Sequence, residues 1–167
     1  MGHMPKIASS IYHAYIELTK PNITSLILVS TALGYYLGGN GFIEFNRLFI
    51  TLAGTCLVSS GAGALNHVVE KESDWLMERT NKRPLPAGLI DSKNAKLFGL
   101  VLIFLGAGIL YHFINPLTSV LAFSTVILYI FVYTPLKKIT WLNTSIGAIP
   151  GSIPVSYTHL RAHETSE

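Results

Sequence analysis

Charged side chains are scarce in this sequence. Asp, Glu, Lys and Arg make up 13% of its 167 residues, half of the chain is hydrophobic, and the mean hydropathy is +0.45. Because a soluble domain carries about 25% charged residues, this composition excludes an ordinary soluble fold and predicts an integral membrane protein embedded in the lipid bilayer. The formal net charge of +3 is modest and does not indicate a nucleic-acid partner.

The sequence has a single cysteine and no visible leader sequence. The single cysteine, Cys56, lies in an apolar run and excludes an intramolecular disulfide. We interpret it as a small core residue. The first ten residues, MGHMPKIASS, contain no long apolar stretch, so no cleaved signal peptide is visible.

Long apolar runs, in contrast, recur along the chain. Four of them cover residues 23–38, 48–69, 96–114 and 117–135, and each approaches the roughly 20 residues that a membrane-spanning helix needs. They lack the alternation of a strand, so they predict helices. A fifth run begins at Trp141 and stops after about half a span. The expected fold class is all-α, a multi-span transmembrane helix bundle with four complete helices and the start of a fifth.

The basic residues are distributed unevenly between the two ends of these runs. One end carries ten of them: Lys6, Lys20, Lys71, Arg79, Lys82, Arg83, Lys93, Lys96, Lys137 and Lys138. The loops at the other end offer only Arg47. Since Lys and Arg stay on the cytoplasmic side of a membrane, we expect the N-terminus and the two basic loops to face the cytoplasm.

Three oxygen-bearing side chains form a stripe at the end of the second apolar run. Asn66, Glu70 and Asp74 are spaced i, i+4 and i+8, which places them on one face of a helix over about 12 Å. Carboxylate and amide oxygens are hard ligands that suit Mg²⁺. Acidic residues at a helix C-terminus are also unfavourable unless a cation is bound. The stripe predicts a metal site, and an ordinary helix end that reaches solvent is the alternative.

A basic loop follows the stripe at once. It contains Arg79, Lys82 and Arg83, and then Pro84 and Pro86, which resist continuation of the helix. Guanidinium groups bind phosphate oxygens in pairs, and Lys acts as a point charge. An acidic stripe beside such a loop is suited to a metal-bound diphosphate. The alternative is a loop whose charge serves only membrane topology.

A third polar patch ends the fourth apolar run. Tyr133 and Lys137 share a helix face if the turn between them is helical, although Pro135 lies within it. The orientation expectation places this patch on the same membrane side as the acidic stripe and the basic loop. An interfacial aromatic residue followed by topological lysines is the alternative interpretation.

Together these motifs resemble a known family. The segment from Asn66 to Gly88 fits N-x-x-x-[DE]-x-x-x-D-x-x-M-x-R-T-x-x-R-P-L-P-x-G, the first acidic motif of UbiA-type intramembrane prenyltransferases. The stretches LTKP at 18–21 and YTPLK at 133–137 resemble other segments of that family. The stretch TWLNTSIGAIPGSIP at 140–154 resembles its protohaem IX farnesyltransferase (haem O synthase) branch.

The resemblance implies a Mg²⁺-dependent transfer of the farnesyl group of farnesyl diphosphate to a vinyl group of haem B, which gives haem O. It implies that Asn66, Glu70 and Asp74 bind the metal and act in catalysis together with Lys137. The implied diphosphate-binding residues are Arg79, Lys82, Arg83, Tyr133 and Lys137. The implied location is a bacterial inner membrane, with the site loops in the cytoplasm.

The sequence departs from the family pattern in two places. Glu70 stands where many members have Asp, although its carboxylate can still bind a metal. Nothing after Pro154 resembles the family, which has a second acidic motif in its C-terminal half. We therefore expect an N-terminal cytoplasmic segment over 1–17, the N-terminal half of a prenyltransferase domain over 18–154, and a non-native tail over 155–167. This chain alone is then expected to be inactive.

Two other functions stay open at this point. One is a UbiA-type prenyltransferase with an aromatic acceptor in place of haem. The other is a membrane binding or scaffold protein that carries the acidic motif without catalysis.

Overall fold

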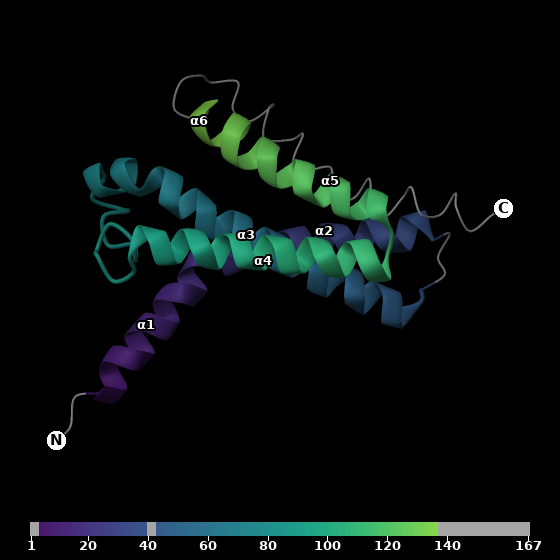
Figure 1. Ribbon diagram of the computed structural model, residues 1–167, viewed down its shortest axis with the longest axis horizontal. Helices are drawn as coiled ribbons and strands as arrows, with labels where there is room; N and C mark the ends of the chain where they lie inside the picture. Colours follow the sequence, from purple (N-terminus) through teal and green to yellow (C-terminus); the bar gives the residue numbers. More distant parts are fainter. Residues whose placement is uncertain (1–3, 40–42, 137–167) are drawn as a thin grey trace.

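The computed structural model describes residues 4–39 and 43–136, and these residues form a bundle of helices without strands (Figure 1). The helices are α1 (Met4–Leu18), α2 (Pro21–Gly38), α3 (Phe45–Leu76), α4 (Ser92–Phe113), α5 (Pro116–Ile127), the π-helix η1 (Leu128–Tyr133) and α6 (Thr134–Leu136). The all-α fold class is confirmed. Several predicted features lie outside the described residues: Lys137, Lys138, the start of a fifth helix from Trp141, and the tail over 155–167.

The four predicted apolar helices are present. Helix α3 continues beyond the apolar run to Leu76, so the whole acidic stripe is helical, as its spacing predicted. The sequence did not predict α1, which diverges from the other helices in Figure 1. Within the described residues, three segments are long and apolar enough to cross a membrane: Phe45–Leu76, Ser92–Phe113 and Pro116–Tyr133. Helix α2 has 18 residues and is not among them.

Local sequence explains where these helices begin. Asn115 caps α5 by accepting a hydrogen bond from the backbone N–H of Thr118 at 2.6 Å, and Pro116 occupies the first turn, where its missing N–H is harmless. Asp91 caps α4 in the same way through the backbone N–H of Lys93. These caps mark where the connecting loops end and α4 and α5 begin.

Glycine makes the contact between α3 and α4 unusually close. A Cβ added to Gly61 would lie 2.5 Å from the Gly99 carbonyl oxygen, and one added to Gly106 would lie 2.7 Å from the Gly54 carbonyl oxygen. Small residues allow helices in a membrane to approach in this way. We call Gly54, Gly61, Gly99 and Gly106 the glycine seam. It fixes the position of α3, the helix that carries the acidic stripe.

A cluster of small and aliphatic side chains joins the N-terminal region to the loop between α3 and α4. Its buried members are Ala14, Leu18, Ala64, Leu85, Ile90 and Ala95, from α1, α3, that loop and α4. Leu85 is only 1% exposed. Burial of a leucine side chain stabilises by about 2 kcal/mol, so the loop is anchored at its middle.

The helix that begins at Pro116 widens before it ends. Its last turns form η1, in which the backbone N–H of Thr134 bonds to the carbonyl of Tyr129, five residues back. Pro135 follows directly, and a proline ring clashes with the carbonyl four residues earlier in a regular helix. A π-turn relieves that clash, and such turns are frequent at functional sites.

Candidate metal–diphosphate site

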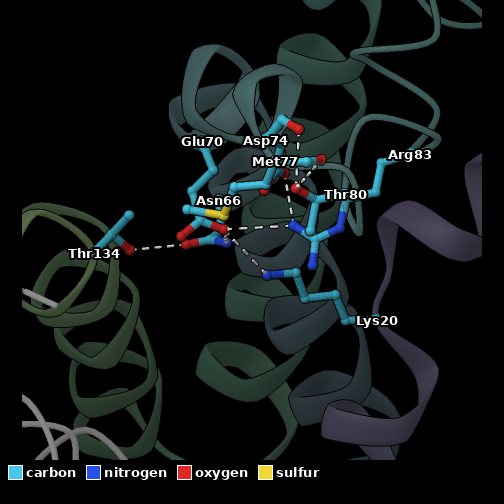
Figure 2. A network of polar contacts seen from close by, with 8 residues as sticks. All are labelled: Lys20, Asn66, Glu70, Asp74, Met77, Thr80, Arg83 and Thr134. Atoms are coloured by element: carbon cyan, nitrogen blue, oxygen red, sulfur yellow. Dashed lines mark hydrogen bonds and ion pairs between the residues drawn. The ribbon is translucent and has the colours of Figure 1, made fainter. Parts of the chain in front are cut away.

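The acidic stripe of α3 is buried. Asn66, Glu70 and Asp74 are 1%, 3% and 5% exposed, although each is polar or charged. Asn66 donates a hydrogen bond from Nδ2 to Glu70 Oε2 at 2.7 Å, which confirms that the i, i+4 spacing brings these side chains together (Figure 2). A buried carboxylate is costly unless it is paired, so its partners define the site.

Two basic side chains from other segments pair with the stripe. Arg83 lies 2.6 Å from Asp74 Oδ2 and 4.0 Å from Glu70 Oε2, while the Lys20 ammonium lies 3.9 Å from Glu70 Oε2. Figure 2 shows Arg83 and Lys20 converging on the stripe. Two carboxylates and two cations therefore form one network whose formal charges cancel.

The fold of the loop after α3 directs Arg83 inward. Thr80 is buried and donates from Oγ1 to the Asp74 carbonyl at 2.9 Å, which satisfies a carbonyl at the end of α3. The Arg83 backbone N–H bonds to the Thr80 carbonyl, and Leu85 anchors the chain two residues later. Gly88 then takes a left-handed φ of 73° that favours glycine. The prediction that the helix does not continue through this basic segment is confirmed.

Lys20 reaches the site from the start of α2. Its backbone lies in the left-handed region with φ 48°, which is uncommon for a residue other than glycine, and Pro21 follows it. Such a conformation costs roughly 1 kcal/mol or more. Strained residues cluster at functional sites, and here the strain accompanies the approach of Lys20 to Glu70.

The fourth contribution comes from α6. Thr134 is fully buried and donates from Oγ1 to Asn66 Oδ1 at 2.8 Å, across 68 positions of sequence. Figure 2 shows it facing Asn66 from the opposite side to Arg83 and Lys20. This contact confirms that the end of the fourth apolar run lies on the same side of the bundle as the acidic stripe.

The other predicted diphosphate ligands are arranged differently. Arg79 and Lys82 are exposed on the loop, and the ion pairs between the loop and the stripe are made by Arg83. Tyr133 stacks on Tyr129, with ring centroids 5.6 Å apart. The fourth predicted residue, Lys137, lies outside the described residues. The roles of these four side chains stay predictions.

Sequence reasoning missed Lys20 and Thr134 as site residues. Both lie in stretches that resemble the family, LTKP and YTPLK, but neither has a periodic relation to the stripe. The only signal in the sequence that could have identified them as site residues was their position in those family-like stretches. Only the packing of α2 and α6 against α3 brings them to Glu70 and Asn66.

The donor set of the stripe fits Mg²⁺. It offers one amide and two carboxylate groups, the oxygen ligands that this ion prefers, over little more than two turns of one helix. Within residues 4–39 and 43–136, no three His, Cys, Asp or Glu side chains form a complete metal cluster. Mg²⁺ commonly keeps waters and shares substrate phosphate oxygens, so one or two protein carboxylates suffice.

A comparison with family models covers the part of the chain that holds these residues. The family model described as "UbiA prenyltransferase family" matches residues 27–159, which include the acidic stripe and the basic loop. The chain belongs to the UbiA prenyltransferase family.

Curated relatives narrow the similarity to one branch. A protoheme IX farnesyltransferase of Solibacter usitatus is 44% identical over 84% of this chain and 51% of the relative. The same-named proteins of Salinibacter ruber and Colwellia psychrerythraea are 43% and 40% identical, over 89% and 92% of this chain and 53% and 51% of their own lengths. The chain thus spans about half the length of the curated relatives it matches. No solved structure matches it.

Proposed function

We propose that this sequence supplies one half of a Mg²⁺-dependent prenyl-transfer site that moves the farnesyl group of farnesyl diphosphate to a vinyl group of haem B, giving haem O. The observation that supports it most is the buried network in which Asn66, Glu70 and Asp74 meet Lys20 and Arg83. Buried ionisable groups at the end of a membrane bundle are expensive and mark functional sites. The names of the relatives support haem as the acceptor.

In this proposal the charged groups exchange partners when substrate binds. The carboxylates of Glu70 and Asp74, with the Asn66 amide, would hold Mg²⁺. Arg83 and Lys20 then turn from those carboxylates to the diphosphate oxygens. Each buried charge keeps an opposite charge beside it in both states, so the desolvation cost of the network does not increase on binding. Mg²⁺ supplies stabilisation of negative charge on the departing diphosphate.

Arg83 and Lys20 stabilise that charge as well. The allylic C–O bond breaks, the diphosphate leaves with the electron pair, and the farnesyl carbon forms a bond with the haem vinyl group. Water adds to the resulting cation and loses a proton, which gives the hydroxyethylfarnesyl product. Fixed donors aimed at the developing charge lower such a barrier without reorganisation. Arg79, Lys82 and Tyr133 are proposed as further diphosphate contacts from the same side of the bundle, and Lys137 is proposed as another contact from its sequence motif.

The activity is proposed for a protein of the relatives' full length that contains this sequence, because the chain spans about half of that length. The site would face the cytoplasm of a bacterial inner membrane. This orientation is supported by the sequence, in which ten basic residues flank one end of the apolar runs and only Arg47 lies in the loops at the other end.

The test is haem O formation by that full-length protein in lipid nanodiscs with Mg²⁺, farnesyl diphosphate and haem B, followed by chromatography and mass spectrometry. Asp74→Asn and Arg83→Met should each lower kcat/KM by about 100-fold or more, the usual loss for removing one group that stabilises developing charge. Glu72→Gln and Lys96→Met are matched controls, because they remove exposed charges near the same end of the bundle. Both controls should retain activity within about threefold.

Three results would contradict the proposal in different ways. Full activity of Asp74→Asn and Arg83→Met would remove the buried network from the reaction. Prenylation of an added aromatic acceptor, with haem B left unchanged, would keep the site and replace the acceptor. Absence of any transfer, with farnesyl diphosphate bound but intact, would favour a binding protein.

A further inference from the structure

The hydroxyl group of Thr134 has two acceptors at the same distance. Its Oγ1 lies 2.8 Å from Asn66 Oδ1 and 2.8 Å from the Tyr129 carbonyl oxygen. A threonine hydroxyl has one hydrogen to donate, so it satisfies one of these oxygens at a time. The Tyr129 carbonyl also accepts the backbone N–H of Thr134 in the π-turn, so it does not depend on the hydroxyl.

Asn66 is held with its amide nitrogen toward the carboxylates. Nδ2 donates to Glu70 Oε2 at 2.7 Å, and Oδ1 points to Thr134. An amide nitrogen has no lone pair for a metal, so the atom that faces Glu70 is the one that cannot bind Mg²⁺. The two ends of an amide have nearly the same shape, and a half-turn of the group therefore requires no repacking.

From this arrangement we propose that Thr134 is a positioning residue that sets the orientation of the Asn66 amide, donating to Oδ1 when the site is free of metal and accepting from Nδ2 when the amide turns Oδ1 toward a bound metal. The inference rests on the proposed metal at the acidic stripe. It adds a residue of α6, outside the acidic motif, that decides whether Nδ2 or Oδ1 of Asn66 faces the carboxylates.

The hydrogen bonds balance in both orientations. In the first, Thr134 donates to Asn66 and the amide nitrogen donates to Glu70. In the second, the Thr134 hydroxyl donates to the Tyr129 carbonyl, already 2.8 Å away, and its oxygen accepts from the Asn66 nitrogen. The buried amide group keeps a partner at its Thr134 end in each case, as buried polar groups require.

The metal itself favours the second orientation. Turning the amide brings its oxygen to the position 2.7 Å from Glu70 Oε2 that the nitrogen occupies now. Two acceptor oxygens repel each other at that distance unless a cation lies between them. Neighbouring oxygens around octahedral Mg²⁺ are about 2.9 Å apart, given metal–oxygen distances near 2.0–2.1 Å. The existing spacing therefore suits a metal shared by Asn66 and Glu70.

The test measures Mn²⁺ affinity in the presence of inorganic pyrophosphate by electron paramagnetic resonance, with the same full-length protein in nanodiscs. Thr134→Val keeps the shape of the side chain and removes the hydroxyl, which leaves the turned amide nitrogen without its partner. We expect Mn²⁺ affinity to fall by about threefold to tenfold, because a buried N–H without an acceptor is among the costlier defects. Thr134→Ser keeps the hydroxyl and should retain the affinity within about twofold.

Two further variants separate positioning from general stability. Thr31→Val removes the hydroxyl of another fully buried threonine, whose Oγ1 bonds to the Ile27 carbonyl of its own helix. It should leave Mn²⁺ affinity unchanged. Asn66→Asp presents an oxygen at both ends and needs no turn, so adding Thr134→Val to it should lower the affinity little or not at all.

The outcomes distinguish this inference from the proposed function. If Asp74→Asn abolishes Mn²⁺ binding while Thr134→Val binds as tightly as the unmodified protein, or more tightly, the metal site stands and the turning amide is overturned. An equal loss from Thr134→Val with Asn66 and with Asp at position 66 would also overturn it. If the unmodified protein binds no Mn²⁺ with pyrophosphate, the proposed metal site fails and this inference fails with it.

Discussion

The glycine seam between α3 and α4 allows one perturbation to be worked out closely. In Gly61→Ala, the new Cβ would lie 2.5 Å from the Gly99 carbonyl oxygen and 2.7 Å from Ile103 Cγ1. An ordinary contact begins at 3.4 Å, so the two backbones must separate by 0.9 Å at this point, the difference between 3.4 and 2.5. The nearest atom belongs to the backbone, so rotation of a side chain cannot relieve the clash.

The magnitude follows from two opposing effects. Insertion of a methyl group into a tightly packed contact costs about 1–3 kcal/mol. Replacing glycine by alanine within a helix stabilises the folded protein by roughly 1 kcal/mol, because alanine has the higher helix propensity. We therefore expect Gly61→Ala to lower the free energy of unfolding by up to about 2 kcal/mol. The site should also lose affinity for pyrophosphate, because the displaced α3 carries Asn66, Glu70 and Asp74.

Gly108 provides the matched control. It lies in α4 as well, but a Cβ added there meets nothing within 4 Å. Gly108→Ala should therefore leave stability unchanged or raise it by up to about 1 kcal/mol. The free energy of unfolding of both variants is measured by SDS-induced unfolding in mixed micelles, monitored by circular dichroism. The reasoning is refuted if Gly61→Ala is as stable as Gly108→Ala, since the seam would then tolerate the methyl group.

Two further predictions concern the cations around the stripe. Lys20→Gly and Lys20→Met should both weaken farnesyl diphosphate binding in titration calorimetry. Lys20→Gly should be more stable than Lys20→Met by roughly 1 kcal/mol, because glycine adopts the left-handed backbone of this position without strain. Equal stability of the two variants would show that no strain is stored at residue 20. Arg79→Ala and Lys82→Ala should raise KM for farnesyl diphosphate only a few-fold, and less at high salt, since exposed charges are screened. A loss as large as the one expected for Arg83→Met would contradict this ranking.

The sequence was sufficient for features that depend on neighbouring residues. The length of the apolar runs predicted α2, α3, α4 and the helix from Pro116, because a helix in lipid satisfies its own backbone. The i, i+4 spacing predicted that Asn66 and Glu70 would meet, since it is a property of any helix. Helix α1 was missed because it is short and lies outside the apolar runs that guided the prediction.

The sequence could not predict which basic side chain of the loop pairs with the acidic stripe. Arg79, Lys82 and Arg83 carry the same charge in the same loop. The folded path of that loop, with Thr80 bonded to the Asp74 carbonyl and Leu85 buried, turns Arg83 toward Asp74. Loop paths of this kind depend on packing against distant segments, which a local pattern does not contain.

The sequence by itself therefore determined a membrane helix bundle with two carboxylates and an amide along one helix, since hydropathy and helical periodicity are local properties. The tertiary structure alone decided that Lys20, Arg83 and Thr134 complete that stripe. Close packing at the glycine seam, the buried Leu85 and the π-turn before Pro135 place them there. The glycine seam and the burial of Leu85 join segments far apart in the chain, and the π-turn, although local, meets the stripe only when Thr134 packs against Asn66.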